Sequence, residues 1–227
     1  MLGRRLPLSA ERPHLGPMKP LSSAKTTFTT NAEGQLLLTI DHDTVGGVSP
    51  AMLAWWFEHI GENMEYGGKL YPRYLLWHPR DHIHWELHRP APNGGARQGA
   101  YFRIVEAFAA NPNYYVDSTE YVEKLDDHGI SLVRRLPGTE VFRLEHRFAP
   151  ASGGTRYFSR MCVGMDAGPA GRLFNKYVRP RFFPDEAARA WLTHNIEEVS
   201  MFENFLPELY RAAFPQPPAD LGAIARQ

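Results

Sequence analysis

The amino-acid sequence predicts an α+β fold in which a curved antiparallel sheet wraps around a long C-terminal helix. Six β-rich segments separated by short turns, many containing Gly, Pro, Asn or Asp, indicate an antiparallel meander. These segments are residues 82–89, 100–108, 114–124, 130–135, 139–148 and 155–164. After them, Trp191–Pro207 carries apolar side chains at helical spacing, and Pro184 followed by Asp185 and Glu186 marks the start of that helix. Such a sheet has one face to bury, and the helix is available to cover it.

Length and composition limit the classes of protein to which the chain can belong. Its 227 residues fit one large domain, which we expect over 34–213, after a flexible leader over 1–33 and before a tail over 214–227. Basic and acidic residues number 25 each, so no net charge attracts nucleic acid or an anionic membrane. No apolar run approaches the roughly 18 residues of a membrane span, and the single Cys162 fits a reducing compartment. We therefore expect a cytoplasmic protein with neither nucleic acid nor a membrane as partner.

The segments around the meander have their own local signals. Residues 35–41 are a short apolar run, which predicts a strand. Ser49–Pro50 is typical of a helix start, and residues 51–65 have a helix-forming composition. Residues 67–82 are dense in aromatic side chains, histidine and proline, and we expect an ordered loop with a short helical piece there. A Gly- and Pro-rich link over 166–181 leads into the final helix.

One face of the final helix combines apolar side chains with a histidine and a glutamate. On a helix, Trp191, His194, Glu198, Met201 and Phe205 are spaced by three or four residues and share a face. Because the rest of that face is apolar, His194 and Glu198 are expected to point inward, where the pair could grip a small ion. An internal hydrogen bond between the two side chains explains the same pattern without an ion. With a single cysteine in the chain, any metal must rely on His, Asp and Glu.

A second group of ionisable residues lies earlier in the chain. His78, Asp81 and His82 fall within five residues of one another and suggest metal binding or acid–base chemistry, although a surface loop explains them equally well. Pro79 argues against a helical pair here, so we expect one histidine to face the interior as a ligand and the other to support it. Glu106 lies in a β-rich segment, where an outward salt bridge is the alternative to a buried position.

Taken in this order, the Trp77–His82 segment, Glu106 and the helical pair His194-x-x-x-Glu198 resemble the diacetylphloroglucinol hydrolase family. The resemblance implies a helix-grip (START-like) fold and a Zn²⁺ ion held by two histidines and two glutamates. It places these ligands on His78, Glu106, His194 and Glu198. The choice between His78 and His82 stays open, and iron or manganese also suits such a donor set.

The resemblance also implies a reaction and a set of polar pocket residues. The family hydrolyses the carbon–carbon bond between an acyl group and a polyhydroxylated aromatic ring and releases a carboxylic acid, with water activated by zinc. The implied catalytic residues are Asp81, His146 and Tyr157, and the implied substrate contacts are Tyr71, Tyr74 and His82. Two features differ from the family: Asp81 stands where the family has an amide, and the region before the fold is shorter. The expected partner is a small acylated phenol, and a homodimer is left open.

Two other functions fit the same sequence. One is a non-catalytic helix-grip module that binds a hydrophobic small molecule, with His194 and Glu198 paired and no metal. The other is a metal-free polyketide cyclase or dehydratase that uses His and Asp side chains as acid and base. Metal content and sensitivity to chelators distinguish these functions from the zinc-dependent hydrolase.

Overall fold

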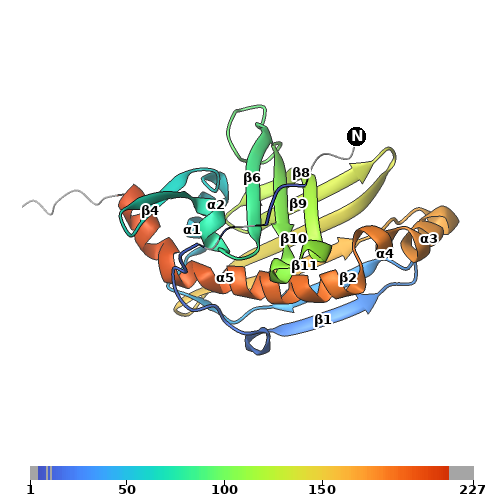
Figure 1. Cartoon of the computed structure of the whole chain (residues 1–227), viewed down its shortest axis with the longest axis horizontal. Coiled ribbons are helices and arrows are strands. Elements are labelled where there is room, and N and C mark those ends of the chain that lie inside the picture. The colour runs from blue at the N-terminus through green and yellow to red at the C-terminus, as the bar shows by residue number, and fades with distance from the viewer. Residues whose placement is uncertain (1–4, 9, 11, 215–227) are drawn as a thin grey trace, which may run out of the picture.

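The computed structural model describes residues 5–8, 10 and 12–214 and is built on one nine-stranded antiparallel sheet (Figure 1). The strand order is β1-β2-β11-β10-β9-β8-β7-β6, and β3 pairs with β11. The strands are β1 (Lys25–Thr30), β2 (Leu36–Asp41), β3 (Val45–Gly46), β6 (His82–Arg89), β7 (Tyr101–Ala107), β8 (Tyr115–Asp126), β9 (Gly129–Leu136), β10 (Thr139–Ala151) and β11 (Gly154–Val163). The predicted meander is therefore confirmed as β6 to β11, and β2 confirms the strand predicted before it.

The long helix α5 (Asp185–Ala213) lies along this sheet and is covered by it on one side (Figure 1). All five residues of the predicted face are buried: Trp191, His194, Glu198, Met201 and Phe205. In β2, alternate residues point toward the helix, so Leu36, Leu38 and Ile40 pack in one core cluster with Trp191 and Ile196. The fold is thus the predicted α+β helix-grip arrangement.

Shorter elements close the two ends of α5. At one end, α1 (Pro50–Glu58), the hairpin β4 (Asn63–Tyr66) and β5 (Lys69–Pro72), and α2 (Arg73–Trp77) gather around it (Figure 1). At the other end lie α3 (Gly168–Tyr177) and α4 (Arg179–Phe182). Three short 3₁₀ turns complete the elements: Leu21–Ser23, Phe108–Ala110 and Pro112–Tyr114.

Several boundaries differ from the sequence-based prediction. The helix predicted over 51–65 ends at Glu58, because residues 63–72 form the β4–β5 hairpin instead. The link predicted over 166–181 contains α3 and most of α4. The leader predicted over 1–33 is too long, since Lys25–Thr30 pairs with β2 as the outer strand of the sheet. That strand is mostly Thr and has one partly buried apolar residue, Phe28, so it lacks the apolar run that marks β2.

Aromatic packing brings the segment after α2 against α5. The Trp77 ring lies 5.0 Å from that of Phe202, and the Trp56 ring lies 4.9 Å from that of Phe205. Trp77 Nε1 also donates a hydrogen bond of 2.7 Å to the main-chain oxygen of Glu198. These contacts fix the chain between α2 and β6 beside the middle of α5, which is where the candidate site forms.

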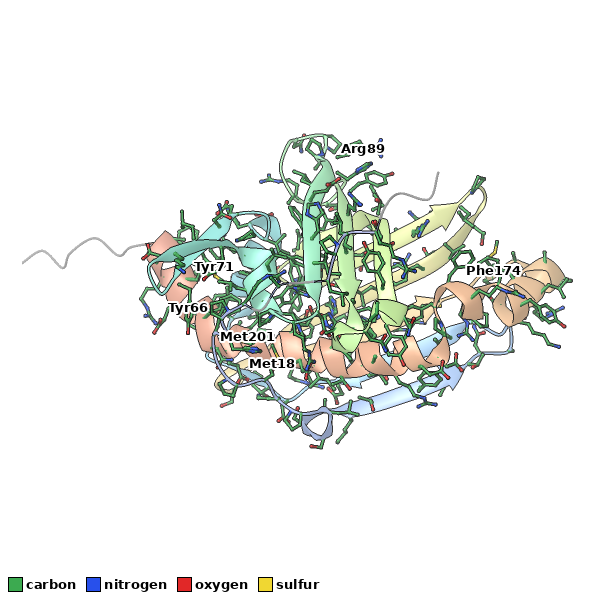
Figure 2. All side chains as sticks on the ribbon, viewed as in Figure 1. Met18, Tyr66, Tyr71, Arg89, Phe174 and Met201 are labelled. Carbon is green, nitrogen blue, oxygen red and sulfur yellow. The ribbon has the colours of Figure 1, made fainter. Side chains whose placement is uncertain are left out.

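The N-terminal segment is bound to the same region. Lys19 N donates to Ser200 Oγ at 2.9 Å, and Met18 packs on the core cluster that contains Met201 (Figure 2). Earlier in the segment, Arg12 Nη1 donates to main-chain oxygens of the segment leading into β6, including that of His82 at 2.9 Å. Among the described residues, none of the helices combines the length and the apolar character needed to cross a membrane.

Candidate metal centre

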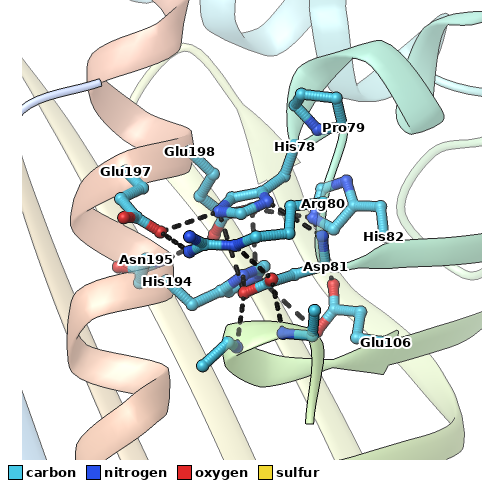
Figure 3. Close-up of polar contacts among 12 residues, drawn as sticks. His78, Pro79, Arg80, Asp81, His82, Glu106, His194, Asn195, Glu197 and Glu198 are labelled. Carbon is cyan, nitrogen blue, oxygen red and sulfur yellow. Dashed lines mark hydrogen bonds and ion pairs between the residues drawn. The ribbon is translucent and has the colours of Figure 1, made fainter. Parts of the chain in front are cut away.

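Two histidines and two glutamates meet between the sheet edge and α5 (Figure 3). His82 and Glu106 face each other directly in the β6–β7 ladder, so their side chains project from the same face of the sheet. His194 and Glu198 are four residues apart on α5. His82 Nε2 lies 3.4 Å from both Glu106 Oε1 and Glu198 Oε2, while His194 Nε2 lies 3.8 Å from Glu106 Oε2 and 3.7 Å from Glu198 Oε2.

This geometry fits a tetrahedral metal site. Ligand atoms about 2.0–2.1 Å from a tetrahedral ion are about 3.3–3.4 Å from one another. One ligand atom each from His82, Glu106 and His194 lies within 4.8 Å of the other two, and Glu198 Oε2 adds contacts of 3.4 and 3.7 Å to the two imidazoles. The side chains of His82 and His194 are 0% and 1% exposed, and that of Glu106 is 13% exposed. Two nitrogens and two carboxylate oxygens in a buried position suit Zn²⁺.

The outer nitrogen of each ring is held by the protein. His82 Nδ1 lies 2.7 Å from the main-chain oxygen of Tyr74, and His194 Nδ1 lies 3.1 Å from Asp81 Oδ2. Because both partners only accept, each ring donates its Nδ1 proton and presents the lone pair of Nε2 to the cluster. Metal-ligating histidines are commonly oriented by such outer contacts. In the neutral form of each ring, these contacts leave the Nε2 lone pair facing the cluster; His194, whose pKa is raised to about 9, would give up its Nε2 proton when a metal binds.

Asp81 supports His194 from behind. Besides His194 Nδ1, its fully buried carboxylate accepts hydrogen bonds from Ala109 N at 2.9 Å, Ala110 N at 3.0 Å and Arg80 Nε at 3.0 Å. Both alanines have positive φ values, 56° and 51°, which turns their amides toward the carboxylate. Burial alone would raise the pKa of Asp81, but His194 and the other donors hold it well below its usual value. Asp81, assigned a catalytic role from the sequence, is placed by the structure as an ionised support.

The two neighbouring histidines, between which the sequence left the ligand role open, lie in different surroundings. His78, placed in the metal site from the sequence, directly follows α2; its Nδ1 accepts from Asp81 N at 3.2 Å and its Nε2 contacts Glu197 Oε2 at 3.1 Å. His82, placed among the substrate contacts, begins β6 and faces Glu106. The atoms of His78, Asp81 and His194 also come close enough for a metal, but this group would need the Asp81 oxygens that the ring and the amides already use.

Tyr74 and Tyr71, both assigned to substrate binding, lie in different surroundings. The Tyr74 hydroxyl donates to Glu106 Oε1, and its ring stacks on His82 with centroids 3.9 Å apart. Burial and the charge of Glu106 raise the pKa of Tyr74 well above its usual value, so the hydroxyl stays protonated and braces the glutamate. Tyr71 is part of the β5 strand and is partly buried against the aromatic core (Figure 2). The structure places it outside the cluster.

The side chains of the cluster strongly shift one another's pKa values. Burial lowers the pKa of His194, but Glu106, Asp81 and Glu198 more than offset this and raise it to about 9. Burial raises the pKa of Glu198, while His194 opposes the shift. Asn195 Nδ2 donates to Glu198 Oε1 at 2.5 Å, a support that the sequence pattern did not reveal, because amides carry no distinctive spacing. The carboxylates therefore surround the two imidazoles with negative charge, which favours the binding of a cation there.

His146 and Tyr157 lie further along the inner face of the sheet, on β10 and β11. Their rings are 5.3 Å apart, and both side chains are nearly fully buried. Burial, followed by the charge of Glu198, raises the pKa of Tyr157 well above its usual value. Within the described part of the chain, the buried Tyr157 hydroxyl has no hydrogen-bond partner. The two side chains therefore lie in the interior, and the charge of Glu198 acts on Tyr157.

No family model and no curated protein matches the chain. Among solved structures, it is similar to Ara h 8.0201 (11% identity, TM-score 0.47, 76% of this chain and 99% of that chain). It is also similar to a START superfamily protein from Mycobacterium smegmatis (10%, 0.44, 73% and 94%) and to the di-domain ARO/CYC BexL from the BE-7585A biosynthetic pathway (12%, 0.47, 82% and 52%). Because these TM-scores lie below 0.5, the class is defined by the chain's own topology and site: a helix-grip α+β protein with a buried two-histidine, two-glutamate cluster.

Proposed function

We propose that the protein is a zinc-dependent hydrolase whose metal ligands are His82, Glu106, His194 and Glu198. The observation that carries this proposal is the convergence of two imidazole Nε2 atoms and two carboxylates in one buried place. A structural pair would need neither the second histidine nor the second glutamate. The outer contacts of both rings, to the Tyr74 main chain and to Asp81, add the orientation that metal ligands require.

Zinc in such a site polarises a carbonyl group and supplies a nucleophile from water at neutral pH. The protein's own groups hold the ion and the substrate. Asp81 and Tyr74 keep His194 and Glu106 in place, and the unpartnered Tyr157 hydroxyl together with His146 offers polar contacts for phenolic oxygens. Burial lowers the pKa of His146 to about 3, so its ring is neutral at pH 7 and offers one hydrogen-bond donor and one acceptor to a ligand.

The proposed substrate class is an acylated polyhydroxy-aromatic compound, as the resemblance to diacetylphloroglucinol hydrolase implies. In the reaction, the hydroxyl of water bonds to the acyl carbon, the carbon–carbon bond to the ring breaks, and the ring carbon receives a proton. The products are a carboxylic acid and the deacylated ring. A ring with several hydroxyl groups can carry the electron pair of the broken bond on a ring oxygen, which makes the ring an adequate leaving group.

The test is elemental analysis of the purified protein beside a turnover screen on acylated phloroglucinols. The proposal expects about one zinc ion per chain, release of the carboxylic acid, and loss of turnover after chelation that added zinc restores. A protein that neither contains nor takes up metal would overturn the proposal. A zinc-loaded protein that binds these compounds without cleaving them would leave the binding-module function instead.

A metal-free acid–base enzyme, such as a cyclase or dehydratase, is the second candidate. It is favoured by the contacts of 3.4–3.8 Å between the imidazoles and the glutamates, because these ion pairs compensate the buried carboxylates without any ion. For this candidate, turnover of a polyketide-like substrate would be unaffected by a chelator. The same chelation experiment therefore separates the two candidates.

A further inference from the structure

A buried serine joins two histidines outside the candidate metal centre. Ser159 Oγ lies 2.9 Å from His42 Nε2 and 2.9 Å from His146 Nδ1. The arrangement follows from the ladder: His146 and Ser159 face each other across β10 and β11, and His42 directly follows β2, the strand on the other side of β11. Ser159 is 0% exposed and His146 is 5% exposed, so these two members of the hydrogen-bonded series are shielded from water.

The two histidines at the ends of this hydrogen-bonded series, His42 and His146, face different surroundings. His42 is half-buried and lines a hollow at the surface together with Lys19 and Glu203. His146 lies inside, beside Tyr157, whose hydroxyl has no partner among the described residues. Among the described residues, His146 Nδ1 contacts Ser159 Oγ, and no hydrogen bond involves His146 Nε2. The hydrogen-bonded series therefore leads from the surface to His146 Nε2 in the interior, an atom with no hydrogen bond among the described residues.

The chemistry of the hydroxyl couples the two rings. Burial lowers the pKa of both His42 and His146 to about 3, so both rings are neutral at pH 7 and each carries one N–H. A serine hydroxyl has a single proton and two acceptor lone pairs. Because the two rings are the only side-chain partners of Ser159 Oγ among the described residues, its buried proton is satisfied only if Ser159 donates to one ring and accepts from the other. Because it contacts Nε2 of His42 but Nδ1 of His146, both rings must be Nδ1–H tautomers or both must be Nε2–H tautomers.

The geometry points to a proton relay in which Ser159 and His42 carry protons between the surface hollow and His146. This inference rests on the proposed function, because the relay would move the protons that the proposed reaction transfers. When His146 Nε2 takes a proton from the reacting molecule, its Nδ1 proton passes to Ser159 Oγ, and the serine's own proton passes to His42 Nε2. His42, whose ring also interacts with the Asn195 side chain, then releases its Nδ1 proton to the hollow that the residue lines. One proton enters, one leaves, and both rings have changed tautomer together.

Histidine tautomers test the coupling without any substrate. In the full-length protein labelled with ¹⁵N-histidine, long-range ¹H–¹⁵N spectra at pH 7 identify the tautomer of each ring, and His42→Gln and His146→Gln assign the signals. The relay expects the wild-type rings to share one tautomer, and it expects Ser159→Ala to abolish this correlation. Opposite tautomers, or a charged ring at pH 7, would overturn the relay.

Turnover tests the role of the relay in the reaction. We expect Ser159→Ala and His42→Gln to lower kcat at least tenfold with little change in KM, and Ser159→Thr, which keeps a hydroxyl, to restore most of kcat. Ser131→Ala is the matched control, because Ser131 is a buried serine on β9 that faces Glu145 across the β9–β10 ladder, whereas Ile130 faces His146. Unchanged kcat in Ser159→Ala would refute the relay. Absence of turnover in the wild-type protein would instead refute the proposed function, and the tautomer spectra would still decide the coupling.

Discussion

His194 donates its Nδ1 proton to Asp81 Oδ2 at 3.1 Å, and this hydrogen bond turns Nε2 of the same ring toward Glu106 and Glu198. Asp81 is in turn held by the amides of Ala109 and Ala110. The orientation of His194, a proposed ligand on the helix, is thus set by Asp81 in the segment between α2 and β6. A group that touches no metal can in this way decide how well the metal is bound.

The first prediction follows from that contact. Asp81→Asn removes the charge facing His194 and places an amide near the two main-chain N–H donors, so one donor or the ring must lose its partner. We expect zinc affinity to fall about 10–100-fold, measured by competition with a chromophoric chelator. The control is Asp117→Asn, because Asp117 is paired with Arg103 on an exposed part of the sheet. Equal affinity in Asp81→Asn and wild type would refute the supporting role.

The second prediction distinguishes the two histidines. His82→Gln should abolish stable zinc binding and turnover, because Nε2 of His82 lies among the other ligand atoms. His78→Gln should keep most of the zinc, because His78 contacts Glu197 and the main chain of Asp81 instead. Metal content after gel filtration, measured for both variants in parallel, decides the matter. The opposite pattern would return the ligand role to His78.

The third prediction contrasts two adjacent glutamates on α5. Glu198→Gln should abolish turnover and weaken zinc retention sharply, since a neutral amide is a poor ligand for the ion. Glu197→Gln should lose little of either, because Glu197 pairs with His78 and Arg80 rather than with the proposed ligands. If Glu197→Gln were the inactive variant, the assigned helix face would be wrong. Zinc occupancy and hydrolysis are the two measurements.

The fourth prediction concerns Glu120, a buried carboxylate on β8. Burial raises its pKa from 4.5 to about 7. The folded protein therefore binds this proton more tightly than the unfolded chain, and stability falls as pH rises from about 4.5 to 7 and then levels off. Replacing the carboxylate by an amide removes this loss. We expect Glu120→Gln to be more stable than wild type at pH 8 by up to about 3 kcal/mol, and nearly equal at pH 4.

Urea unfolding at both pH values measures the effect of Glu120→Gln. Glu123→Gln is the control in the same strand: hydrogen bonds from Arg143 and Arg135 lower the pKa of Glu123, so its removal should cost a little stability at pH 8. A Glu120→Gln variant that gained nothing at pH 8 relative to pH 4 would show that Glu120 ionises normally in the folded protein.

The sequence predicted the parts of this fold that depend on local pattern. The turns between 82 and 164 and the alternation within each segment were enough for β6 to β11, and the spacing of Trp191 to Phe205 was enough for the buried face of α5. The β4–β5 hairpin and β1 were missed, because their strands are short or mostly polar and are fixed by pairing rather than by an apolar period.

The candidate site shows the same limit. His194 and Glu198 could be paired from helix geometry alone, whereas the choice between His78 and His82 depended on which residue faces Glu106 across a ladder. That register is a long-range property, and Pro79 removes any local period from which to infer it. Ser159 carried no signal at all, because its importance comes only from the two strands that flank it.

The four proposed ligands are contributed by the outermost strand β6, its neighbour β7 and the last helix. During synthesis, a chain that has emerged only as far as β11 possesses half of the donor set, and the other half arrives with the final element. A zinc site built as proposed is therefore complete only after α5 has docked on the sheet. The fraction of protein that binds metal would then report the fraction that is fully synthesised and folded. A chain that ends before His194, or one whose last helix has not docked, would bind no metal.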